Sequence, residues 1–160
     1  MTRIGITGHQ ELDSKDAWTW VTRVMLNELA EIMPPIIAVT SLAIGADQLL
    51  ARLVLKKGGT IHAILPYANI ERSFSPENLD SFRDLVSHAT VEILNNPGGD
   101  ENSYLAAGQR VADISDLMFA VWNGKPAKGK GGTADIVAYA LSLHKPLIHI
   151  NPITQIVRHL

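Results

Sequence analysis

Short apolar runs rich in β-branched residues alternate along the chain with segments of helical period, and this alternation limits the fold more than any other feature. Strands that are apolar at consecutive positions and are separated by helices are typical of a parallel sheet covered on both faces. The sequence therefore predicts an α/β fold, a Rossmann-like three-layer sandwich with a mostly parallel sheet of about six strands. The expected strands are Ile4–Thr7, Ile36–Thr40, Thr60–Leu65, Thr90–Leu94, Leu117–Trp122 and Pro146–Ile150.

The length and composition indicate one domain, residues 1–160, that folds without covalent staples. A chain of about 150 residues buries roughly 70% of its unfolded surface, and the absence of cysteine rules out disulfides and thiolate chemistry. No segment approaches the roughly 18 uninterrupted apolar residues of a membrane span, and the N-terminus MTRIGITG enters a strand pattern rather than a signal peptide. We therefore expect no membrane contact and a cytoplasmic location.

The net charge of the chain indicates which classes of partner it can bind. Fourteen Lys and Arg against 16 Asp and Glu give a net charge of −2, without the basic excess that usually accompanies binding to a polynucleotide. Nucleic acid is therefore not the expected partner, whereas a small anionic ligand is allowed. No pair of histidines has helical ligand spacing and no His/Asp/Glu cluster is present, so we expect neither a metal nor a cofactor.

The polar and glycine-rich stretches fall in the connections that lead from strand to helix, whereas the connections from helix to strand are short and plain. In an open parallel sheet these strand-to-helix loops share the edge at which ligands usually bind. The loops in question are 7–10, 41–47, 66–75, 95–102 and 123–133.

Two known phosphate-binding motifs are absent at this edge. Gly124–Lys130 matches most of the Walker A spacing, but Gly131 follows where a Ser or Thr should hold magnesium. After the first strand the chain has Gly5-x-x-Gly8 rather than GxGxxG, and the second strand continues into Ser41 without an acidic residue. Neither a P-loop nor a standard NAD site is expected.

Two loops nevertheless have features of an anion site. Gly131-Gly132-Thr133 opens a helix, where free N–H groups favour an anion by about 0.3–1 kcal/mol; alternatively, it is a flexible glycine loop with Thr133 as an ordinary N-cap. The second loop, Thr40–Asp47, enters a helix through small and hydroxylated residues. Asp47 is either a favourable charge in the first helical turn or an acceptor for a ribose hydroxyl.

Taken together, Ile4–His9, Thr40–Gln48, Ser115–Asp116 and Gly131–Thr133 resemble the SLOG superfamily in their order along nearly the whole chain. That superfamily joins the lonely-guy (LOG) phosphoribohydrolases, which activate cytokinins, with the DNA-processing protein A group and many nucleotide-sensing domains. The resemblance implies a Rossmann-like domain that binds a nucleotide or a nucleotide-derived ligand. The residues predicted to form that site are Gly8, His9, Ser41, Gly45, Ala46, Asp47, Arg72, Gly131, Gly132 and Thr133.

The sequence departs from the pattern of the enzyme subgroup. The phosphoribohydrolases resemble PGGxGTxxE, and aligning Gly132-Thr133 with its GT places Ile136 at the glutamate, with Asp135 one residue earlier. Because adjacent helical residues point about 100° apart, Asp135 does not simply inherit the role. The family's arginine falls on Ala107, and the nearest arginine is Arg110, either at the same site from the same helix face or in a surface charge role. Asp135 and Arg110 remain weak catalytic candidates.

Several single residues have two interpretations. His9 either contacts a phosphate or acts as an acid or base, or it is a hydrogen-bonding loop residue. Arg72 is either a phosphate clamp or a solvated loop arginine. Tyr104 and Trp122 either stack on a base or belong to the core. His62 and His149 lie within strands, and both are expected to be buried or half-buried with satisfied hydrogen bonds.

The favoured function is therefore binding of a small nucleotide-like ligand, as a sensor or carrier. The alternative is a LOG-like hydrolase that cleaves the N-glycosidic bond of a nucleoside monophosphate. A third interpretation, a module that binds single-stranded DNA, rests only on the Ser41–Asp47 stretch. A homo-oligomer is also compatible with the resemblance.

Overall fold

The computed structural model describes residues 1–96, 101–126 and 131–160. They form a seven-stranded sheet of order β4-β3-β2-β1-β5-β6-β7, in which the first six strands are parallel and β7 runs antiparallel to β6. This arrangement confirms the predicted Rossmann-like α/β class. The strands are β1 Thr2–Gly8, β2 Ile36–Thr40, β3 Thr60–Leu65, β4 Ala89–Ile93, β5 Leu117–Val121, β6 Leu147–Asn151 and β7 Ile156–His159.

Strand β7 was not predicted because its sequence has no apolar run. Its four residues, IVRH, follow a turn that begins after β6, and three of them are exposed. Pairing of its backbone with β6, from Ile148 opposite His159 to Asn151 opposite Ile156, makes it a strand. A local sequence pattern carries no information about such a non-local pairing.

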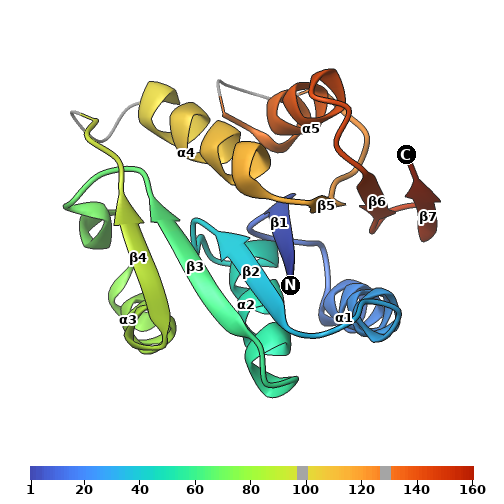
Figure 1. Cartoon of the computed structure of the whole chain (residues 1–160), viewed down its shortest axis with the longest axis horizontal. Helices are drawn as coiled ribbons and strands as arrows, with labels where there is room; N and C mark the ends of the chain where they lie inside the picture. Colours follow the sequence, from blue (N-terminus) through green and yellow to red (C-terminus); the bar gives the residue numbers. More distant parts are fainter. Residues whose placement is uncertain (97–100, 127–130) are drawn as a thin grey trace.

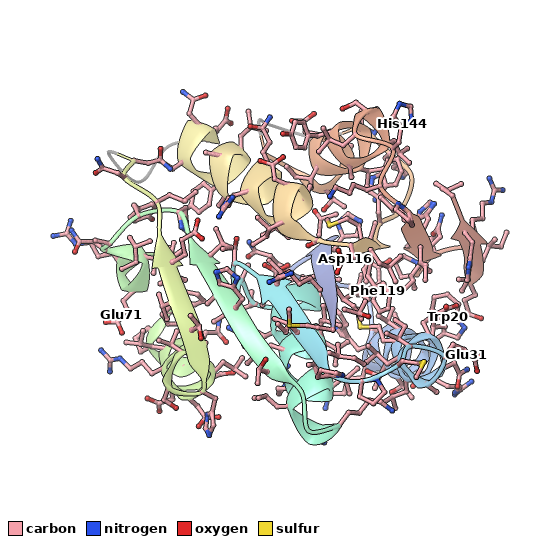
Figure 2. The ribbon with its side chains drawn as sticks, in the orientation of Figure 1. Trp20, Glu31, Glu71, Asp116, Phe119 and His144 are labelled. Atoms are coloured by element: carbon pink, nitrogen blue, oxygen red, sulfur yellow. The ribbon has the colours of Figure 1, made fainter. Side chains whose placement is uncertain are left out.

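Helices cover both faces of the sheet in two layers (Figure 1). Helices α1 (Lys15–Ala30), α2 (Ala46–Lys56) and α3 (Pro76–Ser87) pack on one face, and α4 (Glu101–Ile114) and α5 (Thr133–Ser142) pack on the other. A short 3-10 helix, η1, spans Ile70–Ser73. Phe119 of β5 is fully buried in the interior of the sandwich (Figure 2). No helix in the described part of the chain is long and apolar enough to cross a membrane.

Helix α1 illustrates how the sequence specifies these elements. Ser14 is its N-cap and accepts a hydrogen bond from the backbone N–H of Ala17 at 3.1 Å, which satisfies one of the free N–H groups of the first turn. Val21, Met25 and Leu29 recur at helical spacing and are fully buried against the sheet. The apolar stripe therefore fixes which face of α1 packs on the core.

The order of the strands defines a switch point beside β1. From β1 the chain proceeds through β2, β3 and β4 in one direction, and β5 then pairs with the other side of β1. In open α/β sheets ligands bind outside the carboxyl ends of the strands, where the order reverses. The loops that follow β1 and β5 flank this point, and the loop after β2 lies next to it.

Candidate functional site

The loop between β2 and α2 is held in a strained conformation. Leu42 is fully buried and has φ of 58°, in the left-handed region that a bulky side chain rarely adopts. Its N–H donates to the hydroxyl of Thr40 at 3.0 Å, and its carbonyl accepts from the side-chain amide of Gln48 at 3.0 Å. A strained backbone of this kind persists only where surrounding contacts hold it in place, and it occurs most often at functional sites.

The carboxylate of Asp47 faces this same loop. Asp47 is only 8% exposed, and its Oδ2 accepts from the backbone N–H of Ala43 at 3.3 Å. Burial raises the pKa of Asp47 to about 7, although hydrogen bonds from Ala43, Thr40 and Ser41 act in the opposite direction. Asp47 therefore organises the loop that contains Ser41, and contact with a ribose hydroxyl stays a prediction.

Gly45 and Gly8 allow α2 to approach the loop after β1. Gly45 has φ of 86°, and a Cβ at this position would lie 2.4 Å from the carbonyl oxygen of Gln10. A Cβ on Gly8 would lie 2.6 Å from that of Ala46. The N–H of Ala46 donates to the carbonyl of His9 at 3.2 Å, so this N–H at the start of α2 already has an acceptor within the chain.

Replacing Gly45 with Ala should therefore destabilise the fold by more than about 1 kcal/mol, since it adds a backbone clash to the cost of a positive φ. Gly58→Ala is the matched control, because Gly58 has φ of 82° and no atom within 4 Å of the added Cβ. Urea unfolding of both variants measures the difference. Equal losses of unfolding free energy would show that the close approach of Gly45 to Gln10 is not important.

His9 connects the loops after β1 and β5 across the switch point. Its ring Nε2 accepts from the backbone N–H of Asn123 at 3.1 Å, and the backbone N–H of His9 donates to the carbonyl of Val121 at 3.1 Å. Burial lowers the pKa of His9, and a side-chain hydrogen bond with Asn123 opposes that shift. Because Nε2 accepts, the proton of the neutral ring is on Nδ1. His9 therefore acts here as a hydrogen-bonding loop residue; contact with a phosphate stays a prediction.

The glycine turn before α5 packs on α4. Gly131 has φ of 81°, and a Cβ there would lie 2.6 Å from the backbone nitrogen of Leu105. Gly132 is the N-cap of α5 and provides no side-chain cap, whereas Thr133 is the first helical residue. The alternative that Thr133 is the N-cap is therefore wrong. The stretch 127–130, which includes Gly129 and Lys130 of the Walker-like spacing, lies outside the described residues.

An aromatic pair lies next to this turn. The hydroxyls of Tyr67, just after β3, and Tyr104 of α4 are 3.0 Å apart, and the rings meet edge to face with centroids 6.0 Å apart. The carbonyl carbon of Tyr104 lies 3.0 Å from the Cβ position of Gly131, while its side chain is 39% exposed. Burial and the hydrogen bond with Tyr67 raise the pKa of Tyr104 to about 12, so the hydroxyl of Tyr104 is neutral at physiological pH.

Arg72 belongs to η1, in the connection between β3 and α3 that also contains Tyr67. Its side chain is exposed, and among the residues that the structure describes no carboxylate lies within ion-pair distance of it. Arg72 is therefore a cation available to solvent, and its role as a phosphate clamp stays a prediction.

The two positions at which the enzyme subgroup has its catalytic pair are filled with apolar side chains. Ile136 and Ala107 are each 2% exposed and belong to the core beneath α4 and α5. Ile136 packs so closely on α4 that a Cβ at Gly108 would lie 2.4 Å from its Cδ1. Neither position faces solvent.

The two weak catalytic candidates have separate partners. Arg110 forms a two-pronged ion pair with Glu92 of β4, at 2.8 and 3.1 Å, and His62 lies 3.5 Å from the same carboxylate. Asp135 is exposed, and its Oδ2 accepts from the N–H of Gly131 at 3.2 Å. The structure thus pairs Arg110 with β4 rather than with Asp135.

The strand histidines match the expectation of half-buried, satisfied side chains. His62 contacts Glu92, and Nε2 of His149 lies 2.8 Å from the carbonyl of Trp122. Trp122 packs against the ring of His149 with centroids 5.0 Å apart, and its indole N–H donates to the carbonyl of Lys125 at 2.8 Å. In the described part of the chain, no group of three or more His, Cys, Asp or Glu is placed to hold a metal.

Three polar residues of this region were not predicted from the sequence. Thr40 and Gln48 hold the strained loop, and Asn123 contacts His9. Thr40 ends a predicted strand, Gln48 follows the loop 41–47 and Asn123 begins the loop 123–133, so position is the only signal that the sequence offers. Their partners were not inferable because the contact between His9 and Asn123 joins residues 114 positions apart.

Solved structures with the same arrangement of strands and helices define the fold type. DNA processing protein A from Streptococcus pneumoniae superposes with a TM-score of 0.69 at 17% sequence identity, over 92% of this chain and 50% of that one. The Helicobacter pylori protein, described with a single-stranded DNA binding mode, gives 0.67 at 18% identity, over 92% and 64%. The chain shares the Rossmann-like fold of these two proteins, which the resemblance to the SLOG superfamily predicts.

A third structure of this fold is the molybdenum cofactor carrier protein from Chlamydomonas reinhardtii, with a TM-score of 0.53 at 21% identity over 92% of this chain and 75% of that one. The chain spans 50% and 64% of the two DNA processing proteins. Neither a family model nor a curated protein sequence matches it. At these identities, the likeness establishes the Rossmann-like fold alone.

Proposed function

We propose that this chain binds a small phosphate-bearing ligand, a nucleotide or nucleotide-derived molecule, and serves as a sensor or carrier. The observation that carries the proposal is the packing of an anion-favouring helix end on the backbone of α4 at Tyr104, whose aromatic side chain is partly exposed. The turn Gly131–Thr133 opens α5 and packs directly on the backbone of Tyr104 and Leu105. A phosphate suits the N-terminus of a helix, and an aromatic ring suits a base.

The surrounding loops support the same location. The Ser41–Gly45 loop, rigidified by Thr40, Asp47 and Gln48, follows the strand next to the switch point. A loop fixed before binding loses less conformational entropy when a ligand binds. Arg72 adds a solvent-accessible cation in the same connection between β3 and α3 that contains Tyr67.

Binding without cleavage is favoured over hydrolysis. Ile136 and Ala107, at the positions of the family's glutamate and arginine, are apolar and buried. Arg110 is engaged by Glu92, and Asp135 accepts from the glycine turn. A chain with this arrangement retains the loops proposed to bind phosphate, but it lacks the glutamate and arginine that the resemblance associates with cleavage of an N-glycosidic bond.

The other structures of this fold are compatible with a carrier role. One is named as a carrier of the molybdenum cofactor, and another is described by its binding of single-stranded DNA. The net charge of −2 favours a small ligand over a polynucleotide here. Single-stranded DNA therefore enters the experiment as a competing outcome.

Native mass spectrometry of the purified chain, after incubation with nucleoside monophosphates, ADP-ribose and cyclic nucleotides, tests the proposal. A retained intact ligand is expected, and at a hundredfold excess over its Kd it should add roughly 2.7 kcal/mol to the unfolding free energy. Released base or retained ribose 5-phosphate would instead establish the hydrolase. Retention of no small ligand, together with salt-sensitive binding of an oligonucleotide, would favour the DNA-binding alternative.

A further inference from the structure

A hollow of about 660 Å³ lies at the opposite edge of the sheet from the candidate ligand site, where helices end and strands begin. The hollow has two sides, which we call banks. The α1 bank is formed by residues between Leu29 and Ile36, at the end of α1 and the start of β2, and the α2 bank is formed by Lys57–Gly59, between α2 and β3. Lys57 is the one charged residue of an otherwise apolar or glycine lining. The hollow is therefore distinct from the loops proposed to bind a nucleotide.

An exposed apolar side chain lies directly beside this hollow. Ile32 and Pro34 line it, whereas Met33 between them does not and is 81% exposed. Met1, 69% exposed, lies at the same edge, since the N–H of Thr2 donates to the carbonyl of Pro35 at 3.0 Å. Methionine side chains adapt to irregular apolar gaps. When one surface has both a projecting side chain and a hollow, a twofold axis can place the side chain of each copy in the hollow of the other.

The charges on the two banks are also complementary. Glu31 follows α1 and is exposed at the margin of the molecule (Figure 2). Lys57, with Lys56 beside it, is exposed on the α2 bank. A twofold rotation about the hollow brings the α1 bank of one copy to the α2 bank of the other. Opposite charges then face each other twice, which favours this orientation over others.

We propose that a second copy of this chain docks at this edge. In the resulting twofold dimer, Met33 of each copy enters the hollow of the other, and Glu31 faces Lys57 across the interface. The proposal does not depend on the nucleotide site, because the two sites lie at opposite edges of the sheet.

Sedimentation velocity of the full chain across the micromolar range tests the dimer. The wild-type chain should dimerise, and Met33→Asp should raise the dimer Kd at least about tenfold, because it places a charge in an apolar hollow. Ile153→Asp is the matched control, since Ile153 is also a solvent-exposed apolar residue, 62% exposed, but belongs to the turn before β7. A monomeric wild-type chain, or a dimer that Met33→Asp leaves unchanged, overturns the proposal.

A charge exchange tests the orientation. Glu31→Lys and Lys57→Glu should each weaken the dimer, because each places like charges opposite one another. The double variant Glu31→Lys with Lys57→Glu should recover wild-type affinity. Circular dichroism of each variant separates loss of pairing from loss of fold. A folded double variant that dimerises no better than the single variants overturns the pairing of these two banks.

Discussion

Gly132→Asp is expected to lower the affinity of the chain for nucleoside phosphates at least about a hundredfold while the fold stays intact. The carboxylate would stand at the N-terminus of α5, where the phosphate is proposed to bind. Two like charges about 4 Å apart repel by about 4 kcal/mol at an effective dielectric constant near 20. That exceeds the roughly 2.8 kcal/mol that corresponds to a hundredfold change in Kd.

The fold should tolerate this change because the backbone at Gly132 is ordinary. Its φ of −67° and ψ of 168° are extended values that any residue adopts, and Asp is a preferred N-cap. Gly132→Asn is the matched control, since it has nearly the same size and capping ability without the charge. Isothermal titration with the ligand found by mass spectrometry measures both. Equal affinities of the Asp and Asn variants would place the phosphate elsewhere.

The fold followed from the sequence because its main determinants are local. Consecutive apolar residues in β5 and the stripe of Val21, Met25 and Leu29 in α1 identify elements without knowledge of their neighbours. The parallel arrangement then follows from alternation of strands and helices. Strand β7 lacks such a pattern, since its pairing with β6 alone defines it.

The edge of the sheet that holds the candidate site was also predictable, but the contacts within it were not. Topology places the loops of His9, Asp47 and Gly131 at the carboxyl ends of the strands. The burial of Asp47 depends on how α2 packs, and the partner of Arg110 is a residue of β4. Such properties arise from tertiary packing, and a motif within one segment gives no information about that packing.

The unfolding free energy should fall as the pH rises from about 4 to about 7, through the contribution of Asp47. Burial raises the pKa of this carboxyl from 3.8 to about 7, so between these values the folded chain binds a proton that the unfolded chain has lost. The stabilising contribution is complete below the unfolded pKa and is lost as the pH passes through the folded one. Each pKa unit corresponds to about 1.4 kcal/mol, so the full change is on the order of 4 kcal/mol.

Asp47→Asn removes this titration and keeps a side-chain oxygen that can accept from the N–H of Ala43. Burial lowers the pKa of His9, and a lowered histidine pKa makes stability rise with pH, which opposes the effect of Asp47. The difference between the wild type and Asp47→Asn isolates the contribution of Asp47, because His9 is common to both. Urea unfolding at pH 5 and pH 8 measures that difference, with Asp135→Asn as the control at an exposed carboxylate. If the unfolding free energies of the wild type and of Asp47→Asn change in parallel with pH, the carboxyl of Asp47 does not titrate in this range.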